Sequence, residues 1–164
     1  MNSTATNQRG FSLINGIIAL AVVGVLFGAV VPQVTAIVLD NRATTETEEI
    51  ARALNLARSQ AVTLRKQVIV SAHNADWSQG MQIWVDHNAD KAMSEDELLY
   101  RLPALITGAS LKERSERTEF SFDTRGFART AITFDYLAEA GCNWNHEIKV
   151  KYTGRTTLKD SGCL

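Results

Sequence analysis

Residues 11–39 contain no Asp, Glu, Lys, Arg or His, and this charge-free stretch constrains the fold more than any other feature. From Gly16 to Val31 every residue is apolar or glycine. A core helix of a small domain needs one polar face, which this stretch lacks. A secretory signal has a shorter apolar region that ends in a cleavage site of small residues. Because roughly 20 apolar residues cross a bilayer core, the stretch predicts a transmembrane helix that anchors the rest of the chain.

The rest of the chain has the composition of one small folded domain. The 164-residue sequence is 45% hydrophobic and 21% charged, with 17 Lys and Arg against 18 Asp and Glu. This composition excludes a disordered or collagen-like chain. Because the net charge is only −1, any surface for nucleic acid or an anionic membrane has to be local.

Residues 40–66 have a helical period and predict that the apolar helix continues beyond the membrane. The apolar positions recur three and four residues apart and form one stripe: Ile50, Leu54, Ala57, Ala61 and Leu64. The charged positions lie largely off that stripe: Glu46, Glu49, Arg52, Arg58 and Arg65. We expect the stripe to pack against a sheet, and a partner-binding helix face is the alternative.

After residue 66 the pattern changes to short alternating runs of β-branched and aromatic residues. Six strands are predicted: Val68–Ala72, Met81–Val85, Leu98–Leu102, Thr118–Asp123, Ala131–Asp135 and Glu147–Tyr152. Residues 123–126 (Asp-Thr-Arg-Gly) predict a hairpin turn, and residues 104–117 predict a loop between sections of sheet. The predicted fold class is α+β, with a long N-terminal helix packed on an antiparallel sheet.

A short polar leader with one positive charge ends in Gln8-Arg9-Gly10, and the apolar stretch begins directly after it at Phe11. This arrangement resembles the type IV pilins and the type II secretion pseudopilins. In that family a prepilin peptidase cleaves after the Gly and methylates the new N-terminal Phe. The resemblance implies cleavage between Gly10 and Phe11 and N-methylation of Phe11. Pro32 adds to it, because the family commonly has a proline at this distance from the cleavage site.

Further segments narrow the resemblance to the minor pilins and pseudopilins of the FimT, FimU and GspH group. The matching segments are Asn41-Arg42, Leu54–Val62, Trp77–Asp86, Asp86–Asp90, Glu97–Arg101 and Tyr152–Arg155.

The resemblance implies a division of the chain into four parts. These are a prepilin leader (1–10), a transmembrane helix (11–39), its periplasmic continuation (40–66) and a β-rich globular domain with the pilin fold (67–164). The protein is expected in the bacterial inner membrane as a single-pass protein with a periplasmic C-terminal domain, with other minor and major pilins or pseudopilins as partners. Its expected function is to prime or cap assembly of a type IV pilus, and a minor pseudopilin of type II secretion is an alternative.

Asn15, the fifth residue after the expected cleavage site, departs from the family, which usually has Glu there. In the family this carboxylate meets the charged N-terminal amine of an adjacent subunit. An asparagine accepts a hydrogen bond but does not neutralise an amine. Two interpretations remain open: a low-copy subunit at the filament tip, where no subunit above needs its amine neutralised, or a substitution that only weakens assembly.

The acidic segment after residue 85 has the spacing of a calcium loop. Asp86, Asn88, Asp90 and Glu97 stand at positions 1, 3, 5 and 12 of an EF-hand loop. Position 6, however, is Lys91, where the sharp turn requires glycine, and no flanking pair of helices is predicted. We therefore expect no dedicated metal site and interpret the segment as a solvated loop or an acidic docking face.

The two cysteines, Cys142 and Cys163, predict a disulfide, because an exported domain folds in an oxidising compartment. A metal pair with His146 and a catalytic thiol are the alternatives, and neither finds enough partners in the sequence. The sequence contains no HExxH motif and no recognisable Ser-His-acid arrangement. We therefore predict no enzymatic activity and no cofactor.

The C-terminal segment has a local excess of basic residues, which indicates a contact with DNA. Its basic residues outnumber its acids by two between positions 143 and 164: Lys149, Lys151, Arg155 and Lys159. Lys149 and Lys151 alternate on one face of the predicted strand, so both can meet phosphates. The resemblance to FimT-like minor pilins implies binding of double-stranded DNA during uptake in natural transformation. That group's Gly-Arg-x-Arg motif is present here only in part, as Gly154-Arg155. The alternative is a strand edge whose lysines deter aggregation.

Overall fold

The computed structural model describes residues 13–88, 90, 92–106, 108–138 and 145–162, with the backbone alone described for residues 26–40. The chain divides into two compact units, Met1–Val38 and Leu39–Leu164. One helix, α1 (Leu13–Leu64), contributes residues to both units.

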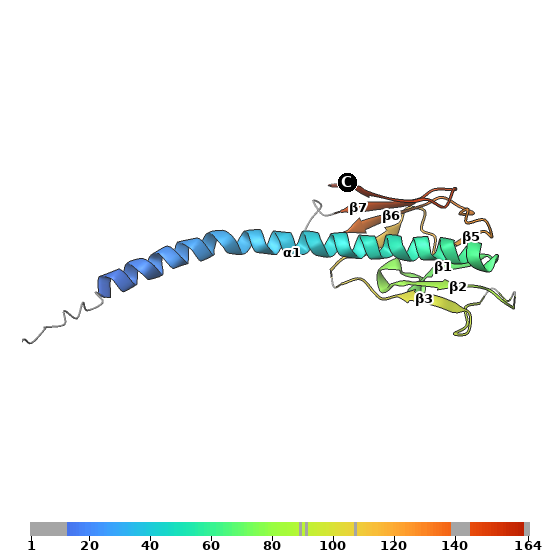
Figure 1. Cartoon of the computed structure of the whole chain (residues 1–164), viewed down its shortest axis with the longest axis horizontal. Coiled ribbons are helices and arrows are strands. Elements are labelled where there is room, and N and C mark those ends of the chain that lie inside the picture. Colours follow the sequence, from blue (N-terminus) through green and yellow to red (C-terminus); the bar gives the residue numbers. More distant parts are fainter. Residues whose placement is uncertain (1–12, 89, 91, 107, 139–144, 163–164) are drawn as a thin grey trace, which may run out of the picture. The chain divides into compact units, whose positions relative to one another are not determined.

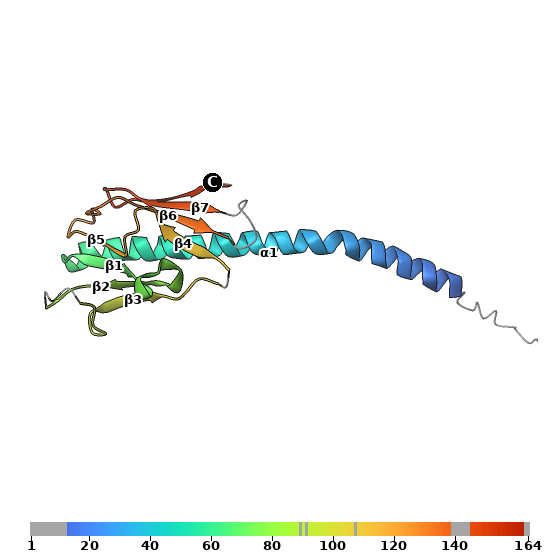
Figure 2. The same ribbon diagram turned by 180° about the vertical axis from the view of Figure 1, so that it is seen from behind.

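The second unit packs α1 from residue 39 onward against two four-stranded antiparallel sheets (Figures 1 and 2). The first sheet has the order β3-β2-β1-β5 and contains β1 (Val68–Ala72), β2 (Met81–Trp84), β3 (Leu98–Leu102) and β5 (Glu119–Phe122). The second sheet has the order β4-β6-β7-β8 and contains β4 (Ser110–Glu113), β6 (Ile132–Leu137), β7 (His146–Val150) and β8 (Thr156–Asp160). Two short 3-10 helices lie between β1 and β2: η1 (His73–Ala75) and η2 (Trp77–Gln79).

The predicted α+β class, a helix packed on antiparallel strands, is confirmed. The six predicted strands occur within two residues of their expected ends, and β1 and β3 have the expected bounds. The strands form two sheets rather than one. The expected loop over residues 104–117 is wrong in part, because β4 lies inside it, and β8 was not predicted. Both are edge strands, whose few apolar residues give little alternation to detect.

The core lies between the helix and the inner faces of both sheets. The α1 stripe supplies side chains that are fully or almost fully buried: Ile50, Ala53, Leu54, Ala57 and Ala61. Alternate residues of the strands complete it, as in β1 and β6, where burial alternates with exposure along the strand. The Trp77 ring lies 4.9 Å from Phe134 of the second sheet and 6.4 Å from Phe120 of the first sheet, so it joins the two layers.

The buried stripe of α1 ends before the helix does. Leu64, expected as its last member, is 41% exposed. The next residue, Arg65, has φ = 53°, a left-handed conformation that terminates a helix. Residues 65–67 then lead directly into β1.

Candidate functional site

The first unit presents its apolar side chains to the outside. Leu13 is 84% exposed and Leu20 is 73% exposed. Asn15 is exposed on the same helical segment. The described part of the chain contains no helix whose length and apolar content suffice to cross a bilayer. The expected cleavage site at Gly10 and Phe11 lies outside the described residues. Pro32 lies within α1, where only its backbone is described.

Glu46 connects α1 to the second sheet and to the segment that joins the two sheets. Its side-chain Oε2 accepts a hydrogen bond of 2.6 Å from the Tyr136 hydroxyl of β6. Its Oε1 accepts one of 2.7 Å from the backbone N–H of Ile106, between β3 and β4. Burial, together with the hydrogen bond to Glu46, raises the pKa of Tyr136 well above its ordinary value. We call this contact of Glu46, Ile106 and Tyr136 the carboxylate latch.

The latch corrects one expectation from the helical period. Glu46 was expected off the buried stripe, yet it is only 8% exposed. Its two hydrogen bonds compensate for the desolvation of the carboxylate. Its partners lie 60 and 90 residues further along the chain, so no local pattern could have identified them.

The acidic loop between β2 and β3 uses its carboxylates to hold its own backbone. Oxygens of Asp86, Asp90 and Glu97 lie within 4.8 Å of one another. Both oxygens of buried Glu97 accept hydrogen bonds, one of 2.7 Å from the backbone N–H of His87 and one of 2.8 Å from the Ser94 hydroxyl. These bonds, led by the one from His87, lower the pKa of Glu97. The EF-hand spacing did not predict this loop-closing role.

Two of the four predicted phosphate ligands lie beside acids on the second sheet. Lys149 Nζ is 3.3 Å from Glu147 Oε1. Lys159 stands directly opposite Glu147 across the β7–β8 ladder. Arg114 also contacts Glu147, at 3.1 Å, and Asp135, at 2.6 Å. The field of these carboxylates makes this part of the sheet a weaker site for phosphate than the sequence suggested.

The other two predicted ligands, Lys151 and Arg155, lie together in the β7–β8 turn. β7 ends at Val150, so Lys151 belongs to this turn and not to the strand face that carries Lys149. The backbone N–H of Lys151 donates to the carbonyl of Arg155 at 3.0 Å. Both side chains are exposed, and neither takes part in the ion pairs found among the described residues.

Gly154 in this turn packs against a second turn and against α1. A Cβ at Gly154, where φ is 76°, would overlap the carbonyl oxygen of Gly126 and come within 2.9 Å of Arg58 Nε. The Arg58 Nε–H donates to the same Gly126 carbonyl at 3.1 Å. Arg58, Gly126 and Gly154 therefore form a close three-way contact, which we call the glycine clasp. Gly154 thus has a structural role beside its place in the partial Gly-Arg motif.

The second turn, residues 123–129, carries functional groups that the sequence analysis did not select as site residues. The Arg125 guanidinium lies 5.2 Å from the centre of the Phe127 ring and bonds Asp123 at 3.0 Å. Hydrogen bonds from the backbone N–H groups of Phe127 and Arg125 lower the pKa of Asp123, with the bond from Phe127 contributing most. The predicted turn at Asp123 is confirmed by the hydrogen bond from the Gly126 N–H to the Asp123 carbonyl, 2.9 Å long.

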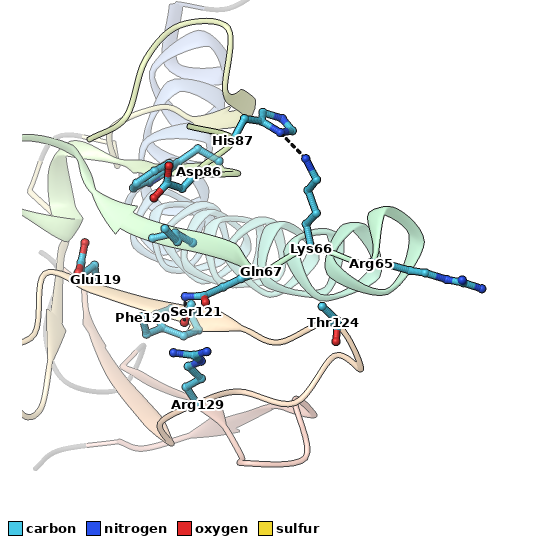
Figure 3. Close-up of a pocket in the computed structure, with 12 residues that line it drawn as sticks. Arg65, Lys66, Gln67, Asp86, His87, Glu119, Phe120, Ser121, Thr124 and Arg129 are labelled. Carbon is cyan, nitrogen blue, oxygen red and sulfur yellow. Dashed lines mark hydrogen bonds between the residues drawn. The ribbon is translucent and has the colours of Figure 1, made fainter. Parts of the chain in front are cut away.

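A groove of about 790 Å³ lies next to the end of α1 (Figure 3). Lys66 Nζ and His87 Nδ1 meet at 2.8 Å across one side of it, and Arg129 extends toward Ser121 from the other side (Figure 3). Asp86 and Glu119 also line the groove, so cations and acids are mixed there.

The predicted disulfide partners, Cys142 and Cys163, lie outside the described residues. The three histidines are apart from one another: His73 contacts Gln82, His87 contacts Lys66, and His146 contacts Asp160.

Comparisons with known proteins identify relatives of this architecture. Residues 46–154 match the family model of type II transport protein GspH. No match was found among curated protein sequences.

Two solved proteins share the fold. The type IV minor pilin FimU of Pseudomonas aeruginosa strain PAO1 matches with a TM-score of 0.63 and 24% identity, over 73% of this chain and 89% of that one. A second crystal form of FimU gives a TM-score of 0.59 over 71% and 91% of the two chains. The minor pseudopilin EpsH of the Vibrio cholerae type 2 secretion system matches with a TM-score of 0.57 and 13% identity, over 73% and 97% of the chains.

Proposed function

This chain belongs to the GspH family of type II transport proteins, and we propose that it is a minor pilin that primes or caps assembly of a type IV pilus at the inner membrane. The family and the structural neighbours support a structural, non-enzymatic subunit of a type IV pilus or a type II secretion system. The function rests on subunit packing through α1.

The observation that carries the proposal is the exposure of apolar side chains on the part of α1 that belongs to the first unit. Its described side chains are apolar apart from Asn15 and most are exposed, so they need an apolar environment that the described residues do not supply. A membrane before assembly and the packed helices of a filament afterwards both supply one. Asn15 carries no charge to pair with the amine of a subunit above it, which supports a place at the filament tip.

Processing by a prepilin peptidase is part of the proposal. Gln8-Arg9-Gly10-Phe11 supports cleavage after Gly10 and methylation of Phe11. A Gly10→Ala variant, co-expressed with the peptidase, should keep its leader and stay out of filaments, as measured by mass spectrometry of the intact chain. A variant that still loses ten residues would refute this step.

The tip position is tested with Asn15→Glu, using Asn15→Gln as the matched uncharged control. In a strain that lacks the native subunit, the wild-type chain should restore the number of pili while remaining at very low copy in sheared filaments. The Glu variant should rise in copy number along the filament, because it can neutralise an amine above it. An unchanged copy number would refute the tip argument. If deletion of the native subunit abolishes protein secretion but leaves the pili normal, the pseudopilin alternative is favoured.

A second candidate function is binding of double-stranded DNA for uptake. The observation that favours it is the exposure of Lys151 and Arg155 in one turn, away from the acids that neighbour Lys149 and Lys159. Two phosphate contacts contribute about −2 to the slope of the logarithm of the binding constant against the logarithm of the salt concentration.

The test measures duplex binding by the full chain in detergent micelles over a range of salt concentrations. Replacing Lys151 and Arg155 by Ala should reduce the slope by about 2, whereas Lys112→Ala, an exposed lysine of β4, should change it little. Binding that is absent at low salt would exclude this candidate.

A further inference from the structure

Two large aromatic side chains are exposed at the end of the second unit where α1 ends. Phe127 is 45% exposed and Tyr152 is 63% exposed. The rings of Phe120, Phe122 and Phe134, by contrast, are buried in the core. Exposed rings of this size supply apolar area that a partner can cover.

The two rings come from segments that are distant in sequence and adjacent in space. The backbone N–H of Ala128 donates to the carbonyl of Tyr152 at 3.0 Å, which joins the 123–129 turn to the β7–β8 turn. The glycine clasp holds the same two turns against α1 through Arg58. Figures 1 and 2 show both turns at the end of the unit where α1 meets β1.

Hydrogen bonds within both turns hold the backbone that carries the two rings. The Asp123 side chain accepts hydrogen bonds of 2.9 Å from the backbone N–H groups of Arg125 and Phe127. In the other turn, the Gly154 N–H donates to the Lys151 carbonyl at 2.8 Å. A surface that is ordered before binding loses little conformational entropy on binding.

The charges around the rings are mainly positive. Within residues 123–129 and 151–155, four cations accompany a single acid, Asp123. That acid bonds Arg125, whose guanidinium lies over one face of the Phe127 ring, 5.2 Å from its centre. Lys151 and Arg155 flank Tyr152 and its exposed ring. We call Arg125, Phe127, Lys151, Tyr152 and Arg155 the aromatic–basic surface.

We propose that the aromatic–basic surface binds single-stranded nucleic acid, with unpaired bases stacking on Phe127 and Tyr152 and the backbone phosphates meeting Lys151 and Arg155. The proposal rests on the second candidate function for its phosphate contacts, and it replaces the duplex by a single strand as the preferred partner. A duplex keeps its bases stacked inside and offers phosphates alone, which leaves both rings unused. A single strand offers phosphates and free base faces together, and flat aromatic groups between cations are the arrangement that such strands use.

The test compares a fluorescent single-stranded 20-mer of thymidine with a duplex of equal length, using the full chain in detergent micelles at fixed salt. The single strand should bind more tightly. Tyr152→Ala and Phe127→Ala should each weaken its binding by roughly 5- to 150-fold, the range expected for loss of one stacked base. Both variants should leave duplex binding unchanged, and Tyr152→Phe should restore single-strand binding because it keeps the ring.

Tyr100→Ala is the matched control, because Tyr100 is 40% exposed on β3 and lies outside this surface. Unchanged tryptophan fluorescence shows that each variant is folded. If duplex and single strand bind equally tightly and the ring variants have no effect, this inference is wrong, while the DNA-uptake candidate is unaffected. Binding of neither probe would overturn both, and the exposed rings would then indicate a docking surface for a protein.

Discussion

The carboxylate latch predicts that Glu46 and Tyr136 are energetically coupled, although they lie 90 residues apart. The Tyr136 hydroxyl donates a 2.6 Å hydrogen bond to a carboxylate that is 8% exposed. A hydrogen bond to a charged group contributes about 1.5–3 kcal/mol to stability. Tyr136→Phe removes this bond and leaves one carboxylate oxygen unpaired, so the free energy of unfolding should fall by about 2 kcal/mol.

Glu46→Ala should have a larger effect than Tyr136→Phe. It removes the acceptor of two donors, the buried Tyr136 hydroxyl and the backbone N–H of Ile106, a residue that is 51% exposed. The unsatisfied hydroxyl costs about 1–3 kcal/mol and the lost hydrogen bond to the charged carboxylate about 1.5–3 kcal/mol, so the expected loss is about 4 kcal/mol. In the double variant the hydroxyl is absent, so only the lost hydrogen bond of Ile106 remains and the loss should be about 2 kcal/mol. The two single losses together exceed the double loss by about 4 kcal/mol, which is the coupling energy between the two residues.

The assay is urea unfolding of the full chain in a mild detergent, followed by tryptophan fluorescence. Trp77 and Trp84 are 5% and 3% exposed, so both report loss of the core. Glu49→Ala is the matched control, because Glu49 is exposed on the same helix and should change stability by less than about 0.5 kcal/mol. A coupling energy below about 0.5 kcal/mol would refute the reasoning, because the two single variants would then act independently.

Three further predictions follow from the turns, the acidic loop and the cysteines. Gly154→Ala should lower the free energy of unfolding by about 2–4 kcal/mol in urea, because the new Cβ overlaps the carbonyl oxygen of Gly126. Gly162→Ala is the control: Gly162 also has a positive φ (59°), but the space around its Cβ is open, so the loss should be only about 1 kcal/mol. Because the pKa of Glu97 is lowered in the folded state, this carboxylate stabilises the fold fully at pH values above its unfolded-state pKa of about 4.3. That stabilisation is lost as the pH falls through the folded-state pKa. Glu97→Gln should therefore reduce the loss of stability at acid pH in a stability–pH profile. Cys142 and Cys163 should both resist thiol labelling in exported protein until it is reduced, and reduction should lower stability by about 3 kcal/mol; labelling of either thiol without reductant would contradict the disulfide.

The sequence predicted the inner part of the fold better than its edges. Val68–Ala72 was predicted with its observed bounds because it is a short run rich in β-branched residues, and in the structure its residues alternate between buried and half-buried. β8 (Thr156–Asp160) has only one apolar residue, Leu158, and that side chain is 43% exposed. Its pairing with β7 is a consequence of the turn at Gly154 and not of its own composition. Local hydrophobic pattern therefore identifies strands that face the core and misses strands that are held by their neighbours.

The candidate site was predictable only where its residues are close in sequence. Lys151 and Arg155 were identified together because one short segment contains both. The proximity of Phe127 to Tyr152 depends on a hydrogen bond between two turns and on the clasp at Arg58, which no spacing rule encodes. A weak signal was present, since each turn contains a glycine with positive φ, but such glycines mark turns without indicating which turns meet.

The latch and the clasp together explain how assembly and ligand binding can coexist on one small unit. Glu46 and Arg58 are 12 positions apart on α1, about 18 Å along a helix, and each holds the helix to structure that is distant in sequence. Between them lies the buried stripe, so the helix and both sheets form one body. The aromatic–basic surface is held to that body by the clasp. Its orientation on that body is therefore set by Arg58 of α1, and weakening the clasp should impair ligand binding without altering any residue that touches the ligand.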